Sequence, residues 1–224
     1  MIKAVVFDAY GTLLSTGTGS LDAAQRILDL HDSAISAKAF YGDWKKHHRK
    51  HIDGLTRFVP EETIFLWDLE KLYEQYRLEG NAAEDVRLML DTLGSRTAFP
   101  ESKAVVEQLK YAYTVCIGST TDTEPLMRDL KRSGISADRI FTSENLQVYK
   151  PQKSFYEKIL TALPLQPQEV LFVGDSLTDD IYGPRQVGMK TCWVNRKGQL
   201  ASVPPPDCEV SDLTGVLAIL EDRL

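Results

Sequence analysis

The stretch Lys3-Ala4-Val5-Val6-Phe7-Asp8-Ala9-Tyr10-Gly11-Thr12, near the start of the chain, decides the fold. Its apolar part is short and continuous, which is typical of a strand buried on both faces. The strand ends at Asp8, where a polar turn begins. Similar apolar runs occur much later in the chain, and together they predict a sheet of buried parallel strands. These later runs cover residues 113–117, 170–173 and 191–194.

Helical patterns separate the apolar runs. Each pattern places apolar side chains three and four residues apart, as one face of a helix requires. Strands that alternate with helices favour a parallel sheet with helices on both faces. The sequence therefore predicts an α/β fold with a Rossmann-like, doubly wound parallel sheet. The predicted helices cover residues 100–110, 123–133, 151–163, 179–187 and 211–220.

Residues 15–92 interrupt this alternation of strands and helices. They carry three apolar stripes at helical spacing and almost no strand pattern. The second stripe is rich in aromatic residues, which is far more typical of packed helices than of a cofactor site. We therefore expect residues 15–92 to form a small α-helical cap inserted after the first strand. Residues 1–14 and 93–224 then form the α/β core.

Composition limits the functions that the chain can have. A chain of 224 residues can bury a substantial core in one or two domains without disulfides. The balance of 26 basic against 32 acidic residues gives a net charge of −6, which argues against a nucleic-acid-binding protein. Three cysteines without CxxC spacing argue against a disulfide framework or a zinc knuckle.

No apolar run approaches the ~20 residues that span a bilayer. The N-terminus also lacks the long apolar segment of a secretory signal. We therefore expect a cytoplasmic protein that binds neither membranes nor nucleic acids. The sequence leaves the oligomeric state open.

Polar side chains follow several of the predicted strands. In doubly wound sheets, ligands bind outside the carboxyl ends of the strands. A carboxylate there can act as a covalent nucleophile, and hydroxyl groups can hold an anionic substrate. A lysine can neutralise developing negative charge, and clustered carboxylates suit magnesium. The candidate residues are Asp8, Ser119, Thr120, Lys150, Asp175, Asp179 and Asp180.

Four motifs in this order resemble those of the haloacid-dehalogenase (HAD) superfamily of hydrolases, and the resemblance covers essentially the whole chain. Each motif is weak by itself, but four in order at strand ends are specific. The resemblance implies that residues 15–92 are the family's helical cap. The motifs are Phe7-Asp8-Ala9-Tyr10-Gly11-Thr12-Leu13, Ile117-Gly118-Ser119-Thr120, Val148-Tyr149-Lys150-Pro151 and Val173-Gly174-Asp175-Ser176, the last continuing through Asp179-Asp180-Ile181-Tyr182-Gly183.

The resemblance also implies roles for individual residues. Asp8 is the expected nucleophile, and Lys150 is expected to stabilise charge. Thr12 and Ser119 are expected to orient the transferring group, and Thr120 is a further candidate catalytic residue.

The same resemblance implies a magnesium site and therefore Mg²⁺ as the cofactor. Asp8, the backbone carbonyl of Tyr10 and Asp175 are the expected ligands, and Asp180 fills the last acidic position.

Tyr10 departs from the phosphatase pattern of this superfamily. Phosphatases usually carry a second aspartate at this position, which protonates the leaving alcohol. A halide leaves without a proton, so Tyr10 suits the 2-haloacid dehalogenase branch, which the first motif resembles more closely. A tyrosine hydroxyl can also donate a proton, but its ordinary pKa near 10 makes it a weak acid.

The fourth motif favours the opposite interpretation. Dehalogenases of this branch are metal-free and have a serine–asparagine pattern there, whereas this chain has Gly174-Asp175-Ser176. The leading interpretation is therefore a magnesium-dependent phosphatase of a small metabolite that acts through an aspartyl-phosphate. The alternatives are a 2-haloacid dehalogenase that forms an aspartyl ester on Asp8, or a catalytically weak binding protein with the same fold.

The predicted cap contains one basic cluster, residues 44–51. Lys45 and Arg49 are candidates for attracting a small anionic substrate, although a solvated helix face would look the same. His47 and His51 have the spacing of two metal ligands on one helix face. No third ligand is evident, so the sequence does not favour a zinc site.

Overall fold

The structure, a computed structural model, describes residues 1–200 and 205–221. The chain divides into two compact units, each with its own core. The core unit comprises Met1–Ser15 and Thr97–Leu224, and the helical unit comprises Thr16–Arg96. Among the described residues, none of the helices combines the length and the apolar character that a bilayer-spanning segment requires.

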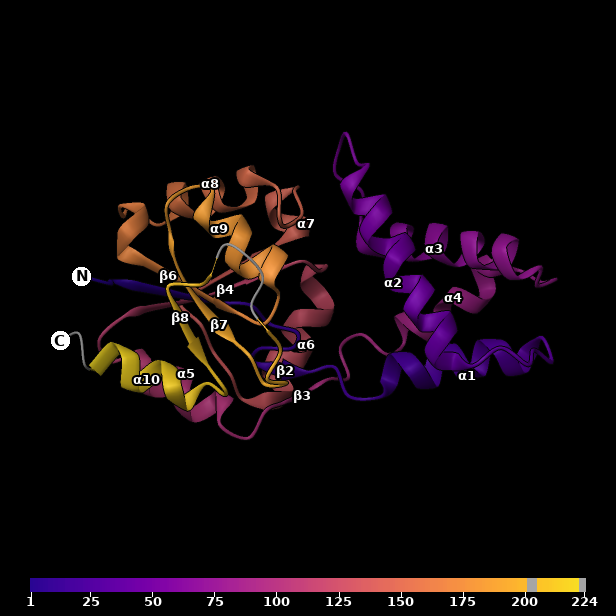
Figure 1. The fold of residues 1–224 in the computed structure, drawn as a ribbon, viewed down its shortest axis with the longest axis horizontal. Coiled ribbons are helices and arrows are strands. Elements are labelled where there is room, and N and C mark those ends of the chain that lie inside the picture. Colours follow the sequence, from indigo (N-terminus) through magenta and orange to yellow (C-terminus); the bar gives the residue numbers. More distant parts are fainter. Residues whose placement is uncertain (201–204, 222–224) are drawn as a thin grey trace. The chain divides into compact units, whose positions relative to one another are not determined.

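The core unit contains a six-stranded sheet in the order β5-β4-β1-β6-β7-β8, and all its strand pairs are parallel (Figure 1). The first strand lies inside the sheet, where Val5 is in register with Val115 on one side and Leu171 on the other. The strands are β1 (Ala4–Phe7), β4 (Thr114–Ser119), β5 (Arg139–Thr142), β6 (Val170–Gly174), β7 (Lys190–Val194) and β8 (Cys208–Val210).

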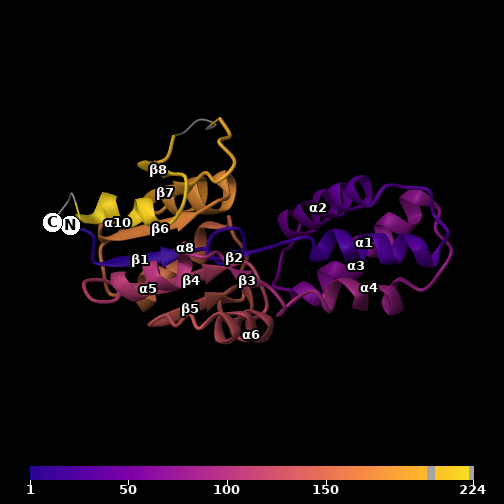
Figure 2. The same cartoon turned by 90° about the horizontal axis from the view of Figure 1, so that it is seen from below.

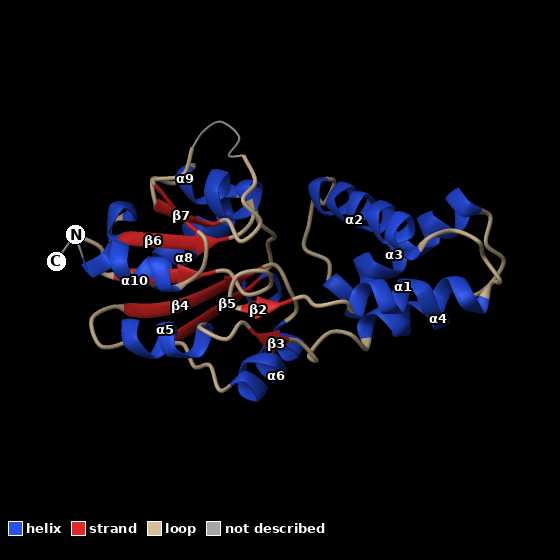
Figure 3. Ribbon diagram, turned by 60° about the horizontal axis from the view of Figure 1, so that its bottom comes forward, coloured by secondary structure: helices blue, strands red, loops and turns tan. Residues whose placement is uncertain are grey.

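Helices cover both faces of this sheet, as Figures 2 and 3 show. The alternation along β1 explains why, since successive side chains of a strand point to opposite faces. Val5 and Phe7 pack into one apolar cluster, whereas Ala4 and Val6 pack into another. The first cluster includes side chains of α5 (Ser102–Leu109), α6 (Thr123–Ser133) and α10 (Thr214–Glu221), and the second those of α8 (Lys153–Ala162). The predicted doubly wound α/β fold is confirmed.

The sequence patterns missed two strands of this sheet, β5 and β8. Both lie at the edges of the sheet and contain a charged residue, Arg139 or Glu209, that is exposed. An edge strand is only half buried, so it does not show a continuous apolar run. The helix predicted over residues 179–187 also differs, because it begins as a π-helical turn over Leu177–Tyr182 and continues as α9 (Gly183–Arg185). Two short helices, α7 (Ser143–Leu146) and the 3₁₀ turn Pro167–Glu169, complete the core unit.

Four helices form the helical unit and share one apolar core. Phe40 and Trp44 are buried in it, and the rings of Trp44 and Phe65 meet edge to face at a centroid distance of 6.1 Å. This core accounts for the aromatic stripes of the sequence. The helices are α1 (Gly19–Leu30), α2 (Ala37–Asp53), α3 (Glu61–Tyr76) and α4 (Ala82–Leu90).

The connections between the units are an antiparallel pair of short strands, β2 (Leu14–Ser15) and β3 (Thr97–Ala98). The sequence predicts the second boundary after residue 92, whereas the structure has it after Arg96. The Arg96 guanidinium donates hydrogen bonds to the Thr16 carbonyl and to the hydroxyls of Ser20 and Thr92, all in the helical unit. These bonds keep residues 93–96 with the helices.

Candidate active site

The candidate active site lies at the carboxyl ends of three neighbouring strands. Asp8 directly follows β1, Ser119 ends β4, and Asp175 directly follows β6. Because β4, β1 and β6 are adjacent in the sheet, their carboxyl ends meet at the same edge. Lys150 and Asp180 reach this edge from the segments that follow α7 and β6.

Lys150 joins two carboxylates in the interior of the core unit. Its Nζ lies 2.8 Å from Oδ1 of Asp8 and 2.8 Å from Oδ1 of Asp180. All three side chains are buried. Burial alone would lower the pKa of the Lys150 ammonium, but the charges of Asp180 and Asp8 outweigh this effect and raise it. Lys150 therefore stays protonated and fixes the orientation of the Asp8 carboxylate.

Asp180 occupies space that a glycine leaves open. A Cβ on Gly174 would lie 2.2 Å from Cγ of Asp180, so only glycine fits at the end of β6. The backbone N–H of Ser176 donates to Oδ2 of Asp180 at 2.9 Å. The π-helical turn that starts at Leu177 thus returns the carboxylate beneath the strand end and toward Lys150.

Asp175 also lies in space that a glycine leaves open, here in the turn that follows β1. Gly11 has a φ of +101°, and a Cβ there would lie 2.5 Å from Oδ2 of Asp175. The indole Nε1 of Trp193 donates to the Asp175 carbonyl at 3.0 Å and holds the backbone in place. Asp175 itself is exposed.

Asp8, Asp175 and Asp180 form one acidic cluster, with a carboxylate oxygen from each within 4.8 Å of the others. The Asp175 side chain reaches solvent, yet protein atoms remove much of the water from its carboxyl group. This desolvation, together with the charge of Asp8, raises the pKa of Asp175 to about 6. Burial and the charges of Asp8 and Asp175 also raise the pKa of Asp180. Three carboxylates beside one lysine leave excess negative charge, and their oxygens are the donors that magnesium prefers.

Two buried oxygens of this region have no hydrogen-bond partner among the described residues. They are Oδ2 of Asp8 and Oγ1 of Thr12. An unsatisfied buried polar atom costs free energy, so such atoms are expected where a ligand supplies the missing contact. The sequence predicts that these two residues act on a bound group, and their orphaned oxygens fit that role.

The Tyr10 hydroxyl binds a side chain outside the acidic cluster. The phenol donates a hydrogen bond to Oδ2 of Asp129 at 2.9 Å, and Asp129 is fully buried on α6. Its one proton is therefore committed to another carboxylate, which does not favour Tyr10 as a proton donor to a leaving group. The backbone carbonyl of Tyr10 remains a predicted metal ligand.

The remaining predicted core residues lie where the motifs require. Ser119 is buried at the last position of β4, and Thr120 is half buried in the turn that follows. Both therefore belong to the edge of the sheet that carries Asp8. Their predicted contacts with a transferring group stay predictions.

Lys45 and Arg49 lie on α2 in the helical unit. Lys45 is exposed with its Nζ 5.1 Å from the Tyr41 ring centroid, and Arg49 lies 3.7 Å from the Asp53 carboxylate. Their predicted role toward an anionic substrate stays a prediction. The idea that His47 and His51 share a metal is not supported by their contacts, because His47 contacts Gln75 and His51 contacts Asp68.

The sequence interpretation missed Arg196, which holds the turn that carries Thr12. Its guanidinium donates to the Thr12 carbonyl at 3.0 Å and to Oε1 of Glu101 at 2.6 Å. The guanidinium carbon also lies 3.7 Å from the centroid of the Phe99 ring. Arg196 follows the carboxyl end of β7, so the rule that found the other candidates would have found it too.

This arrangement defines a hydrolase of the HAD class. A family model for haloacid dehalogenase-like hydrolases matches residues 2–188, and the chain belongs to this family.

Within the family, the chain is similar to (S)-2-haloacid dehalogenase 4A of Burkholderia cepacia, with 29% identity over 95% of this chain and 89% of the relative. It is also similar to mouse N-acylneuraminate-9-phosphatase, with 24% identity over 98% of this chain and 94% of the relative. A solved dehalogenase structure with an intermediate complex superposes with a TM-score of 0.81 at 25% identity, covering 97% of this chain and 96% of that one. The similarity to 2-haloacid dehalogenases is the stronger of these and favours the dehalogenase alternative over the phosphatase interpretation.

Proposed function

We propose that the protein hydrolyses a small 2-haloacid through a covalent ester on Asp8. Lys150 holds Oδ1 of Asp8, whereas Oδ2 has no partner among the described residues and keeps its lone pairs for attack. The similarity to (S)-2-haloacid dehalogenases over almost the whole chain supports the same substrate class.

The proposed reaction has two steps. Oδ2 of Asp8 attacks C2 of the haloacid, a carbon–oxygen bond forms, and the halide leaves with the electron pair of the broken bond. Water then adds to Cγ of the Asp8 ester, which releases the 2-hydroxyacid and restores the carboxylate. Asp175 belongs to the same cluster of oxygens as Asp8 and can accept the proton of this water.

The observation that carries this proposal is the hydrogen bond between Tyr10 and Asp129. A phosphate ester expels an alkoxide, which needs a proton, whereas a haloacid expels a halide, which does not. With tyrosine at this position and its proton held by Asp129, the site suits a leaving group that departs unprotonated.

The acidic cluster supports a second candidate, a magnesium-dependent phosphatase that acts through an aspartyl-phosphate on Asp8. Asp8, Asp175 and the Tyr10 carbonyl would hold Mg²⁺, and Asp180 would complete the acidic set. When bound, the metal supplies positive charge that stabilises an anionic phosphoryl group. Lys150 and the Thr12 hydroxyl would orient that group in either candidate.

One pair of assays separates the two candidates. Halide release from (S)-2-chloropropionate and phosphate release from a set of small phosphate esters are measured with EDTA and with excess Mg²⁺. A dehalogenase releases halide in both conditions and no phosphate. Phosphate release that requires Mg²⁺, without halide release, would overturn the haloacid proposal and support the phosphatase.

For the phosphatase candidate, magnesium binding should depend on pH with a midpoint near the pKa of Asp175. A metal must displace the proton, so Mg²⁺ should raise the melting temperature at pH 7.5 but not at pH 5, where Asp175 is protonated. Differential scanning calorimetry with Mg²⁺ and with Na⁺ at matched ionic strength measures this effect. The Asp175→Asn variant should lose the shift, and an equal shift in both proteins would disprove Asp175 as a ligand.

The cellular location and the partners are predicted from the sequence alone. A small substrate agrees with the hydrolase family, and its anionic character stays a prediction. The cytoplasm as its location and the absence of a nucleic-acid partner stay predictions.

A further inference from the structure

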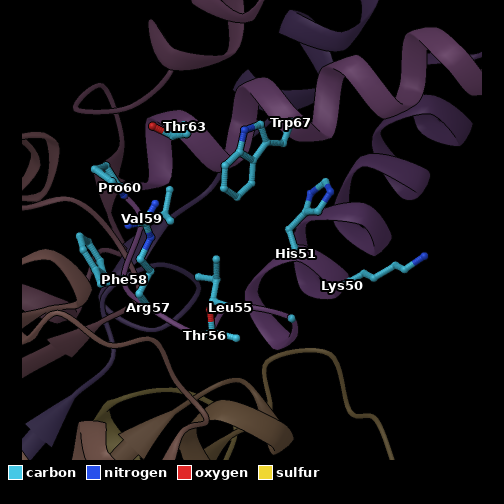
Figure 4. Close-up of a pocket in the computed structure, with 11 residues that line it drawn as sticks. Lys50, His51, Leu55, Thr56, Arg57, Phe58, Val59, Pro60, Thr63 and Trp67 are labelled. Carbon is cyan, nitrogen blue, oxygen red and sulfur yellow. The ribbon is translucent and has the colours of Figure 1, made fainter.

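The helical unit contains a pocket that the proposed chemistry does not use. It has a volume of about 660 Å³, within the usual size range of small-molecule sites. The end of α2, the start of α3 and the loop between them form its walls (Figure 4). The lining residues are Lys50, His51, Gly54, Leu55, Thr56, Arg57, Phe58, Val59, Pro60, Thr63 and Trp67.

The ionisable residues that line the pocket are all of the basic type. Three lining residues are basic in type and none is acidic, although the chain as a whole has a net charge of −6. The nearest acidic residues in the sequence, Asp53 and Glu61, are not among the lining residues. Figure 4 shows Lys50 directed away from the rings of His51 and Trp67, which leaves the exposed Arg57 as the remaining arginine or lysine of the lining.

The His51 ring is held in one orientation by a buried carboxylate. Its Nδ1 lies 2.6 Å from Oδ1 of Asp68, and Nδ1 of His48 lies 2.7 Å from Oδ2 of the same carboxylate. Asp68 is fully buried. The contact with Asp68 therefore fixes the orientation of the His51 ring at the edge of the pocket. A buried group that fixes a pocket side chain reduces the entropy lost on binding.

The other wall groups are apolar. The Trp67 ring lies edge-on to His51 at a centroid distance of 5.9 Å and is half buried. Leu55, Phe58 and Val59 add apolar surface from the loop. A flat apolar group can pack against Trp67 while a negatively charged group meets the Arg57 guanidinium.

We propose that this pocket binds a small organic anion that carries a flat apolar group, such as an aromatic carboxylate. All lining residues belong to the helical unit, so binding is measurable without turnover. The proposal is independent of the reaction proposed for Asp8.

Tryptophan fluorescence of the full chain tests the proposal with three probes. Benzoate has both required groups, benzamide has the ring without the charge, and acetate has the charge without the ring. Benzoate should change the Trp67 emission at concentrations at least tenfold below those at which benzamide or acetate do. The Trp67→Phe variant should lose the signal, which separates this pocket from Trp193 beside Asp175.

Arg57→Gln should weaken benzoate binding about tenfold and leave benzamide binding unchanged, because a charge-assisted hydrogen bond is lost. The matched control is Lys71→Gln, which removes an exposed cation of α3 that does not line the pocket. Equal binding of all three probes would overturn the proposal. So would a benzoate signal that survives in Trp67→Phe or is unchanged in Arg57→Gln. Binding retained in Asp8→Asn would show that the pocket acts without the catalytic carboxylate.

Discussion

Replacement of Asp8 by Asn should reduce turnover by a factor of ~10⁴ or more, the range seen when a covalent nucleophile is removed. Asparagine keeps the shape of the side chain but offers a neutral amide, which is a far weaker nucleophile. Halide and phosphate release measure the loss. Glu124→Gln is the control, because it removes an exposed carboxylate of the core unit. Activity within tenfold of the wild type would exclude the covalent mechanism for either candidate.

A single turnover in ¹⁸O-labelled water adds a readout that activity alone cannot give. In the proposed dehalogenation, water adds to Cγ of the Asp8 ester, so one labelled oxygen should remain in the Asp8 carboxylate. In an aspartyl-phosphate mechanism, water attacks phosphorus and the label leaves with phosphate. Mass spectrometry of the peptide that contains Asp8 distinguishes the two outcomes. If neither substrate class turns over in the wild-type protein, the chain fits the third interpretation, a binding protein with this fold.

Replacement of Lys150 by Met should destabilise the core unit by about 3–5 kcal/mol, as expected when one partner of a buried ion pair is removed. Asp8 and Asp180 would then face each other in the interior without the ammonium between them. Urea denaturation at pH 7.5 measures the loss, and Lys153→Met is the control because its side chain is exposed. Stability equal to that of the wild type would mean that Lys150 is not the counter-charge of the cluster.

The loss in Lys150→Met should be smaller at low pH. A carboxyl group whose pKa is raised in the folded state binds its proton more tightly there than in the unfolded chain. Its contribution to stability is therefore present at low pH and is lost as the pH rises through the folded-state value. Burial already raises the pKa of Asp180, and removal of Lys150 should raise it further. The double variant Lys150→Met/Asp180→Asn should recover part of the stability at pH 7.5, because one buried charge is gone.

The sequence predicted the frame of the core unit because its strands are buried on both faces. Runs such as residues 170–173 are continuous and apolar, and polar residues mark their ends. The two edge strands escaped prediction because a half-buried strand tolerates charged residues such as Glu209.

The candidate site was predictable in its residue types but not in its pairings. Rules on strand ends placed Asp8, Asp175 and Asp180 at one edge of the sheet, and the structure brings their oxygens together. No sequence pattern links Tyr10 to Asp129, since 119 residues separate them and only the fold makes them neighbours. The same reason hid the link between Arg196 and Thr12.

The order of segments along the chain has a consequence for how the protein folds during synthesis. The helical unit is continuous in sequence, so its apolar core can assemble as soon as α4 has left the ribosome. The central strand β1 is made first, yet its partners β4 and β6 are made only after the whole helical unit. Until then β1 is an apolar strand with two open edges, which is an aggregation hazard. Early closure of the helices shortens the effective loop between β1 and β4, and this lowers the entropic cost of pairing them.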